Sequence, residues 1–496
     1  MHISKLESIQ RREFLRRTAA LGVAGTAGPL AMTLAGIGEA AAKTAPEDYK
    51  ALVCIFLYGG NDHDNTFIPY DDTRHGVYQG LRNIGDDKTK IYIPKTNLIP
   101  LVGSGLAAGQ QYAVQPSLVS VGKLFNDTKK LGILLNVGTL VKPTTKTGYT
   151  NARAGDLPPK LFSHNDQFSL WQSGLSSGAE GTTQGWGGRL GDLFLGSDNK
   201  AHFTCINASG NAIFMSGKNV LPYQVSTSGS VAISSITYSE GVYRIPACQT
   251  ALSKLINNSA PSHWMEKEWA RVMKSSIVNR TIVSTGIQTT DPTTQPNYFT
   301  TAFATDSLSA QLKIVARLIQ ARSTLGVKRQ VFFVSMGGFD LHDNLMSAVS
   351  GHNVLLKRVN DAMNSFYNAT VQLGVANQVT AFTASDFGRT MASNGDGSDH
   401  GWGGHHMVMG GAVDGGKFWG KAPDISTSAN ALNEGPDTVG QGRLLPSTSV
   451  DEYAAALARW MGVNETDLPT VLPNLRNFES VSGRSRLPLF VAPPTQ

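Results

Sequence analysis

The sequence predicts an α/β protein built on a mostly parallel, doubly wound sheet with helices on both faces. Four short runs are continuously apolar, which is the pattern of strands that are covered on both faces. These runs lie at 51–57, 131–137, 331–336 and 379–384. From 307 to 384 helical and strand patterns alternate, as they do where helices connect the parallel strands of one sheet.

Three helices follow from apolar spacing and terminal signals. Over 307–325, apolar residues recur every three or four positions, and Gly326 is a suitable C-terminal stop. A second apolar stripe spans 355–366. The segment 449–452 (Ser-Val-Asp-Glu) has the form of a capping box and predicts a helix that runs to Met461.

The segment from about 210 to 305 differs in composition and is interpreted as a Ser/Thr-rich insertion. It contains the loop-like stretch 289–296 and an amphipathic helix predicted within 262–282, with Trp264 and Trp269. We therefore expect one α/β domain over 43–496 that carries this insertion, rather than a second catalytic unit.

Residues 1–42 have the features of a twin-arginine export signal. The Arg11-Arg12 pair precedes an uncharged stretch, 18–37, that is diluted by glycine and is too mild for a membrane span. Three alanines, 40–42, suit signal peptidase, so cleavage is expected after Ala42. The alternative is an uncleaved N-terminal anchor. The twin-arginine translocase is thus an expected partner, and the mature protein is expected to be periplasmic or extracellular, without a stable membrane span.

Charge and cysteine content set further limits. The formal charge is +6, of which residues 1–42 contribute +2. The remaining charge is too small and dispersed to indicate nucleic-acid binding, although it is compatible with an anionic substrate. Cys54 lies inside an apolar run and is expected to be buried. An oxidising compartment would permit a Cys205–Cys248 disulfide, but the sequence does not decide that pairing.

Acidic and histidine residues follow three of the predicted strands. Because ligands bind outside the carboxyl ends of such strands, these side chains are expected at one edge of the sheet. Mixed Asp and His ligands suit zinc, whereas an all-oxygen set would suit magnesium or calcium. One or two divalent ions are therefore expected. The candidate ligands are Asp62, Asp340, His342, Asp386, Asp399 and His400, the last two from a Gly-rich loop over 395–404. Singly, an aspartate after a strand is also a common turn residue or helix cap.

The nucleophile has two candidates. Ser163 precedes a helical stretch, so it would lie at a helix N-terminus, where an oxyanion is favoured; the alternative is a plain N-cap serine. Thr66, at the end of the loop after the first strand, is its competitor. Arg389 is a candidate for binding a substrate oxygen, or else anchors a loop. The sequence contains no Gly-x-Ser-x-Gly elbow and no Walker motif.

Several motifs together resemble a bacterial family of domains of unknown function, number 1501, which is grouped with the alkaline phosphatase and sulfatase superfamily. They are Tyr58-Gly59-Gly60-Asn61-Asp62, Ser163-His164, Gly337-Gly338-Phe339-Asp340-Leu341-His342, Ser385-Asp386-Phe387-Gly388-Arg389-Thr390 and Ser398-Asp399-His400-Gly401. The resemblance implies an alkaline-phosphatase-like α/β sandwich with two metal sites. Phe387 stands where the superfamily has a histidine after Asp386, and Asp399-His400 is expected to replace it. The nucleophile motif of formylglycine sulfatases is missing.

These observations favour an exported metal-dependent hydrolase of a small anionic phosphoester or sulfoester. The alternative is a non-catalytic cell-envelope protein that keeps the fold and binds or assembles a cell-surface component. Phe387 and the Ser/Thr-rich insertion favour this second hypothesis.

Overall fold

The computed structural model describes most of the chain after the predicted signal. The described residues are 49–86, 89–175, 182–196, 199, 201–231, 233, 236, 245–258, 263–288, 299–425, 435–479 and 486–491. The twin-arginine signal predicted at 1–42 and the loop predicted at 289–296 lie outside these residues.

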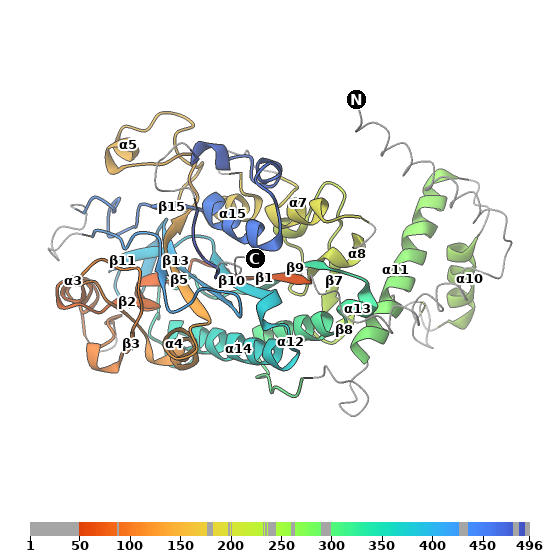
Figure 1. The fold of residues 1–496 in the computed structure, drawn as a ribbon, viewed down its shortest axis with the longest axis horizontal. Helices are drawn as coiled ribbons and strands as arrows, with labels where there is room; N and C mark the ends of the chain where they lie inside the picture. The colour runs from red at the N-terminus through yellow and green to blue at the C-terminus, as the bar shows by residue number, and fades with distance from the viewer. Residues whose placement is uncertain are drawn as a thin grey trace, which may run out of the picture. The chain divides into compact units, whose positions relative to one another are not determined.

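The protein is of the α/β class, with a ten-stranded mixed sheet (Figure 1). Its order is β14-β5-β13-β10-β1-β9-β6-β7-β8, and β15 pairs with β5. The bounds are β1 Lys50–Leu57, β5 Leu131–Gly138, β6 Cys205–Asn207, β7 Tyr223–Ser226, β8 Gly229–Ser230, β9 Arg329–Met336, β10 Val379–Ser385, β13 Gly404–Gly410, β14 Phe418–Trp419 and β15 Thr448–Ser449.

All four predicted apolar runs are strands of this sheet, namely β1, β5, β9 and β10. β1 lies at the centre and pairs in parallel with β9 and with β10. The sheet departs from a purely parallel one at β13, which runs antiparallel between β10 and β5. The chain reaches β13 from β10 through the short pair β11 (Arg389–Ser393) and β12 (Ser398–His400), without a crossover helix. Neighbouring parallel strands need such a crossover, so the return is antiparallel.

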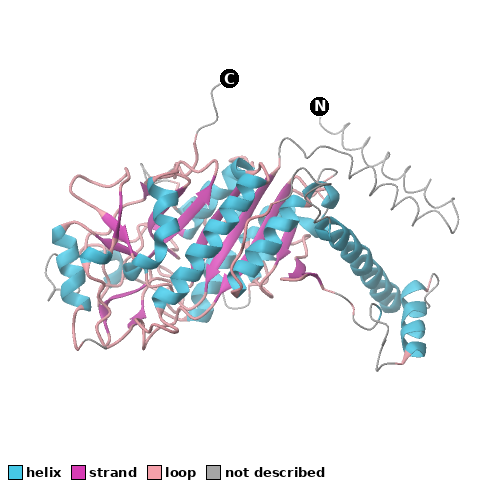
Figure 2. Ribbon diagram, turned by 90° about the horizontal axis from the view of Figure 1, so that it is seen from below, coloured by secondary structure: helices cyan, strands magenta, loops and turns pink. Residues whose placement is uncertain are grey.

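Helices cover both faces of the sheet (Figures 1 and 2). One layer contains α4 (Val119–Asn126), α12 (Ser307–Gln320) and α14 (His352–Gln372), which contact β5, β9 and one another. The other contains α6 (His164–Ser173), α7 (Trp186–Leu193) and α15 (Val450–Met461). The even-numbered side chains of β1 belong to the apolar core on the α15 side, where they meet Trp171 and Tyr453.

The predicted helices are present, with small differences at their ends. The helix expected over 307–325 is interrupted at Ala321, so that α13 (Arg322–Leu325) follows α12 as a separate turn. Gly326, in the left-handed conformation (φ 65°), ends it as expected. The capping box at the start of α15 is formed: Ser449 accepts from the Glu452 amide, and Glu452 accepts from the Ser449 amide.

The remaining elements lie around this core. They are β2 (Phe67–Pro69), β3 (Ile99–Leu101), β4 (Tyr112–Val114), α3 (Asp72–Arg82), α5 (Lys146–Thr150), α8 (Ala201–Thr204), α10 (Pro246–Asn257), α11 (Trp264–Gln288) and α16 (Leu468–Val471), with short 3-10 turns at 63–65, 95–97, 116–118, 213–215, 376–378 and 475–477. Within the described part of the chain, no helix combines the length and the apolar character needed to cross a membrane.

The cysteines do not form the disulfide that the sequence permitted. Cys54, Cys205 and Cys248 are free thiols. Cys205 is buried at the start of β6, where its thiol donates to the Gly187 carbonyl, whereas Cys248 lies half-buried on α10.

Asp451 in the first turn of α15 should make stability depend on pH. Burial raises the pKa of its carboxyl to about 7, against an ordinary value of 3.8, and one carboxyl oxygen lacks a hydrogen-bond partner among the described residues. A raised folded-state pKa gives stability that is present below about pH 4 and is lost as pH rises through about 7. The free energy of unfolding of the Asp451→Asn variant should therefore rise relative to that of the wild type by up to about 1.4 kcal/mol per pH unit across that window.

Chemical unfolding of both proteins from pH 4 to pH 8 measures this difference. Asp361→Asn, at a partly exposed position of α14 where the carboxylate pairs with Lys357, is the matched control. Its free energy of unfolding should not rise relative to the wild type over this pH range. If the difference in unfolding free energy between Asp451→Asn and the wild type stayed constant with pH, the raised pKa of Asp451 would be contradicted.

Candidate metal centre

The backbones of the loops that follow β1 and β9 are in close contact at the carboxyl edge of the sheet. Gly59 has a φ of 112°, and a Cβ atom placed on it would lie 2.3 Å from the Asp340 amide nitrogen. Only glycine fits this backbone conformation and this approach. The Gly-Gly pair after β1 thus lets the loop that carries Asp340 lie directly over the end of the central strand.

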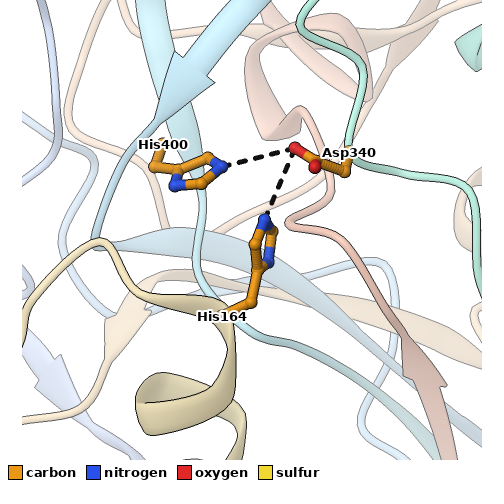
Figure 3. Close-up of side chains that lie close together, drawn as sticks. All are labelled: His164, Asp340 and His400. Carbon is orange, nitrogen blue, oxygen red and sulfur yellow. Dashed lines mark hydrogen bonds and ion pairs between the residues drawn. The ribbon is translucent and has the colours of Figure 1, made fainter.

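Three histidines converge on one carboxylate oxygen at this edge. Asp340 Oδ1 lies 3.1 Å from His342 Nε2, 3.3 Å from His400 Nε2 and 3.4 Å from His164 Nε2. Figure 3 shows His164, from the start of α6, and His400, from β12, with their rings directed at Asp340 from two sides. The ligand atoms of His164, Asp340 and His400 all lie within 4.8 Å of one another.

Each histidine is held through its other ring nitrogen. His164 Nδ1 lies 2.7 Å from Asp386 Oδ2, and His342 Nδ1 lies 3.1 Å from Asp399 Oδ1. His400 Nδ1 lies 2.6 Å from the Phe162 carbonyl oxygen. A carboxylate or carbonyl oxygen only accepts hydrogen bonds, so each Nδ1 is the donor and each neutral ring carries its lone pair on Nε2. This is the arrangement typical of metal-bound histidines.

In the neutral form of these rings, with Nδ1 as the donor, the converging Nε2 atoms carry lone pairs and no proton. His342 Nε2 and His400 Nε2 are only 2.8 Å apart, and His164 Nε2 is buried without a hydrogen-bond partner among the described residues. Ligand atoms of a tetrahedral zinc ion are about 3.3 Å apart, given bonds of roughly 2.0–2.1 Å. The distances of 3.3 and 3.4 Å from Asp340 Oδ1 to His400 Nε2 and His164 Nε2 fit a small divalent cation held by these three residues. His342 Nε2 is close to Asp340 and His400 but is not part of the set whose ligand atoms are all within 4.8 Å of one another.

The electrostatics of the site follow from these contacts. The hydrogen bond to Asp386 raises the pKa of His164, whereas burial lowers the pKa of His400. Burial raises the pKa of Asp386. At Asp340 burial acts in the same direction, but the hydrogen bond and the charge of Arg389 outweigh it and lower the pKa of the carboxyl. Asp340 is thus kept ionised as a ligand requires.

The structure brings five of the six predicted ligands to this edge, but in two roles. Asp340, His342 and His400 face one another directly. Asp386 and Asp399 stand behind His164 and His342 and accept their Nδ1 hydrogen bonds, so they orient ligands rather than share the central position.

Asp62 lies elsewhere, because a buried arginine takes its carboxylate. Arg82 Nη1 and Nη2 donate to the two oxygens at 2.6 and 2.9 Å, and both side chains are at most 1% exposed. Burial alone would raise the pKa of Asp62, but Arg82 outweighs it and lowers the pKa to about 2. Asp62 is therefore committed to an ion pair inside the protein.

The predicted catalytic side chains also have defined partners. Ser163 holds the N-cap position of α6, yet its hydroxyl does not cap the helix and donates to Asp166 Oδ2 at 2.6 Å. Thr66 is fully buried and donates to the Asp62 carbonyl oxygen at 2.7 Å. Arg389 is fully buried and donates to Asp340 Oδ1 and to the carbonyl oxygens of Gly59 and Ser398. Anchoring of loops, the alternative weighed for Arg389, is what these contacts show.

His164 was not among the predicted ligands. Its only signal in the sequence was its place beside Ser163 at a helix start, within one of the family motifs. Phe387 packs against two ligand rings, with ring centroids 4.8 Å from those of His164 and His400. Phe387 thus forms an apolar wall of the site, and His400 directs a ring nitrogen toward Asp340 from β12.

Comparisons with solved structures give distant similarity. The PsFucS1 sulfatase from Pseudoalteromonas sp. shares 11% identity at a TM-score of 0.32, covering 88% of this chain and 72% of that one. The lipoteichoic acid synthase LtaP from Listeria monocytogenes shares 7% identity at a TM-score of 0.26, covering 76% of this chain and 71% of that one. A mutant of the alkaline phosphatase PafA shares 11% identity at a TM-score of 0.26, covering 70% of this chain and 64% of that one.

No curated protein matches the sequence. A family model does, and its description is "Protein of unknown function (DUF1501)". The match extends over residues 49–471 and so includes every residue of the candidate metal centre. It confirms the family resemblance seen in the motifs, and the chain belongs to the DUF1501 family.

Proposed function

We propose that this protein is an exported, metal-dependent hydrolase of small phosphoester or sulfoester substrates. Its metal site is centred on His164, His400 and Asp340, and His342 is the proposed fourth ligand because its Nε2 lies 3.1 Å from Asp340 Oδ1 and 2.8 Å from His400 Nε2. The observation that carries the proposal is the convergence of three Nδ1-anchored imidazoles on one ionised carboxylate at the carboxyl edge of the sheet. Such an arrangement requires outer contacts from several loops, which a chance surface cluster would not have.

Zinc suits this donor set best. Three imidazole nitrogens and one carboxylate oxygen match the ligands of zinc, whereas magnesium and calcium prefer oxygen alone. A zinc ion held here would polarise a phosphoryl or sulfuryl oxygen and lower the pKa of a water molecule. With Asp62 paired to Arg82, the described residues support one ion, not the two that the superfamily resemblance implied.

Ser163 is the proposed nucleophile. It directly precedes the ligand His164 at the start of α6, where the helix dipole and the free amides favour a developing negative charge. Its Oγ would attack phosphorus or sulfur, and its proton would pass to Asp166, to which it is already hydrogen-bonded. The alcohol would leave with a proton from water, and a second water would hydrolyse the serine ester. Thr66 is a poor competitor because it is fully buried.

The class of ester and the location come from sequence features. The alkaline phosphatase and sulfatase resemblance of the motifs selects phosphoesters and sulfoesters among the substrates of metal-dependent hydrolases. The Arg11-Arg12 signal supports twin-arginine export to the periplasm or beyond. Export of a folded protein suits a centre assembled from residues 164, 340 and 400, since such a site exists only after folding.

Removal of a metal ligand should abolish metal binding and activity together. Purified protein is expected to contain close to one zinc ion per chain by elemental analysis, and to hydrolyse at least one member of a panel of aryl phosphates, phosphodiesters and aryl sulfates. His400→Ala should lose most of the zinc and at least about 100-fold in kcat. Asp386→Asn, which changes the group that accepts from His164 Nδ1 and from the Gly59 amide, should weaken zinc binding about 10–100-fold.

His75→Ala is the matched control, because His75 lies in α3, hydrogen-bonded to the Pro69 carbonyl oxygen. It should keep its zinc. Folded, metal-free protein that is inactive on the whole panel would refute the hydrolase and leave the cell-envelope binding protein.

Substitution of Ser163 should separate chemistry from metal binding. Ser163→Ala should retain its zinc but lose about 100-fold or more in kcat, because the attacking oxygen is gone. Thr66→Ser, a conservative change at the competing hydroxyl, should retain activity within a few-fold. Rapid-quench measurements should detect a phosphoserine or sulfoserine in the wild type only. Normal turnover by Ser163→Ala would instead make water the nucleophile.

A further inference from the structure

Helix α11 has an apolar stripe along one face, and the rest of the protein buries only part of it. Residues along one side recur at intervals of three and four, which keeps them on a single face of an α-helix. The apolar members of this stripe are Met265, Trp269 and Val272 in the N-terminal half and Val283 and Ile287 in the C-terminal half, and the polar Ser276 and Asn279 lie between them on the same face. The helix has 25 residues, so it is about 37 Å long at 1.5 Å per residue.

The two halves of the stripe have different surroundings. In the C-terminal half, Val283 and Ile287 are buried, where α11 contacts α12, α13 and β8. In the N-terminal half, α10 contacts α11 and Ala270 is buried, but the stripe is exposed. Met265 is 60% exposed, Trp269 40% and Val272 47%. Trp264, at the start of the helix, is 73% exposed. Large apolar side chains that gather on one face in this way indicate an interaction surface.

The charges on this helical pair are predominantly positive. Within α10 and α11 there are five cations and two acids, which gives a net charge of +3. Lys267, Arg271 and Lys274 recur at helical spacing on a different side of α11 from the stripe. The acid Glu268 is already paired with Arg271. An anionic partner would therefore meet little repulsion here.

We propose that the N-terminal half of α11 docks on the surface of an anionic phospholipid membrane. Tryptophan and methionine opposite a cationic face are the composition of helices that lie in the membrane interface, and lysine and arginine near such a surface are attracted by anionic headgroups. Tryptophan in particular prefers this boundary.

A second copy of the chain fits the open stripe less well. The open part covers about eight residues, or roughly 12 Å of helix. That length presents far less than the about 800 Å² per partner that a stable protein interface needs. A lipid surface requires no complementary shape, so three or four apolar side chains with nearby cations suffice for weak, reversible binding.

Tryptophan fluorescence with brominated lipids tests the proposal on the full chain. Residues 1–48 contain no tryptophan, and Trp171, Trp186, Trp402 and Trp419 are buried. Trp460 is partly buried against Phe490, and Trp460→Phe removes its contribution. In that background, quenching by brominated phosphatidylglycerol vesicles reports chiefly on Trp264 and Trp269. The wild type should be quenched, and phosphatidylcholine vesicles should need at least tenfold more lipid.

Two variants identify the surface. Met265→Asp combined with Val272→Asp should weaken vesicle binding at least tenfold, and Lys267→Glu with Lys274→Glu should do the same without touching apolar packing. Val349→Asp with Leu221→Asp, at loop positions that are even more exposed than Met265 and Val272, is the control and should bind like the wild type. Circular dichroism melts confirm that each variant is folded.

Three results would overturn the proposal. The first is absence of quenching in the wild type, and the second is quenching that neither α11 variant reduces. The third is a dimer, seen by light scattering, that Met265→Asp with Val272→Asp dissociates while vesicles leave the fluorescence unchanged; the stripe would then belong to a second copy. None of these results bears on zinc content or ester hydrolysis.

Discussion

The candidate metal centre depends on one buried guanidinium. Arg389 donates to the Gly59 carbonyl after β1, to Asp340 after β9 and to the Ser398 carbonyl in β12. One side chain thus joins three segments that are far apart in the sequence. A buried cation is stable only while it is paired and hydrogen-bonded, so moving Asp340 away would leave the charge of Arg389 uncompensated. This constraint fixes the carboxylate around which the histidines are arranged.

The histidine rings are fixed by a second set of contacts, in which each Nδ1 is hydrogen-bonded to an oxygen from another segment of the chain. Asp386 lies beside His164 because α6 packs against β10, and Asp399 faces His342 from β12. The third anchor is a backbone carbonyl, that of Phe162, whose φ of 74° is unusual for a residue with a side chain. Backbone strain of this kind persists where the surroundings hold it, and here it aims a carbonyl oxygen at His400. The outer contacts therefore come from three different elements and leave the rings little freedom.

Much of the fold was predictable because its central strands are buried on both faces. β1, β5, β9 and β10 are read directly as apolar runs, and α12, α14 and α15 from stripes and caps. β13 was not predicted as an inserted antiparallel strand, and its residues His405 and His406 are buried inside the sheet. Asp340, His342 and His400 were predictable as residues that follow strands or lie in a Gly-rich loop. His164 was not, since it comes from a helix start and its position depends on contacts with β10 and β12 that no local pattern encodes.

The same distinction explains why we propose one metal ion although the motifs resemble a superfamily with two. Asp62 follows the first strand, where the resemblance places a ligand, but the sequence of that loop does not show that Arg82 will fold back from α3 onto it. Once the Arg82–Asp62 pair is buried, recruiting Asp62 to a cation would leave the Arg82 guanidinium uncompensated in the core, at a cost of several kcal/mol. Phe387 removes a second ligand from the same region and packs on the rings that remain. Two independent changes, a competing cation and an apolar ring, thus oppose a second ion while the His164–His342–His400–Asp340 set is kept together.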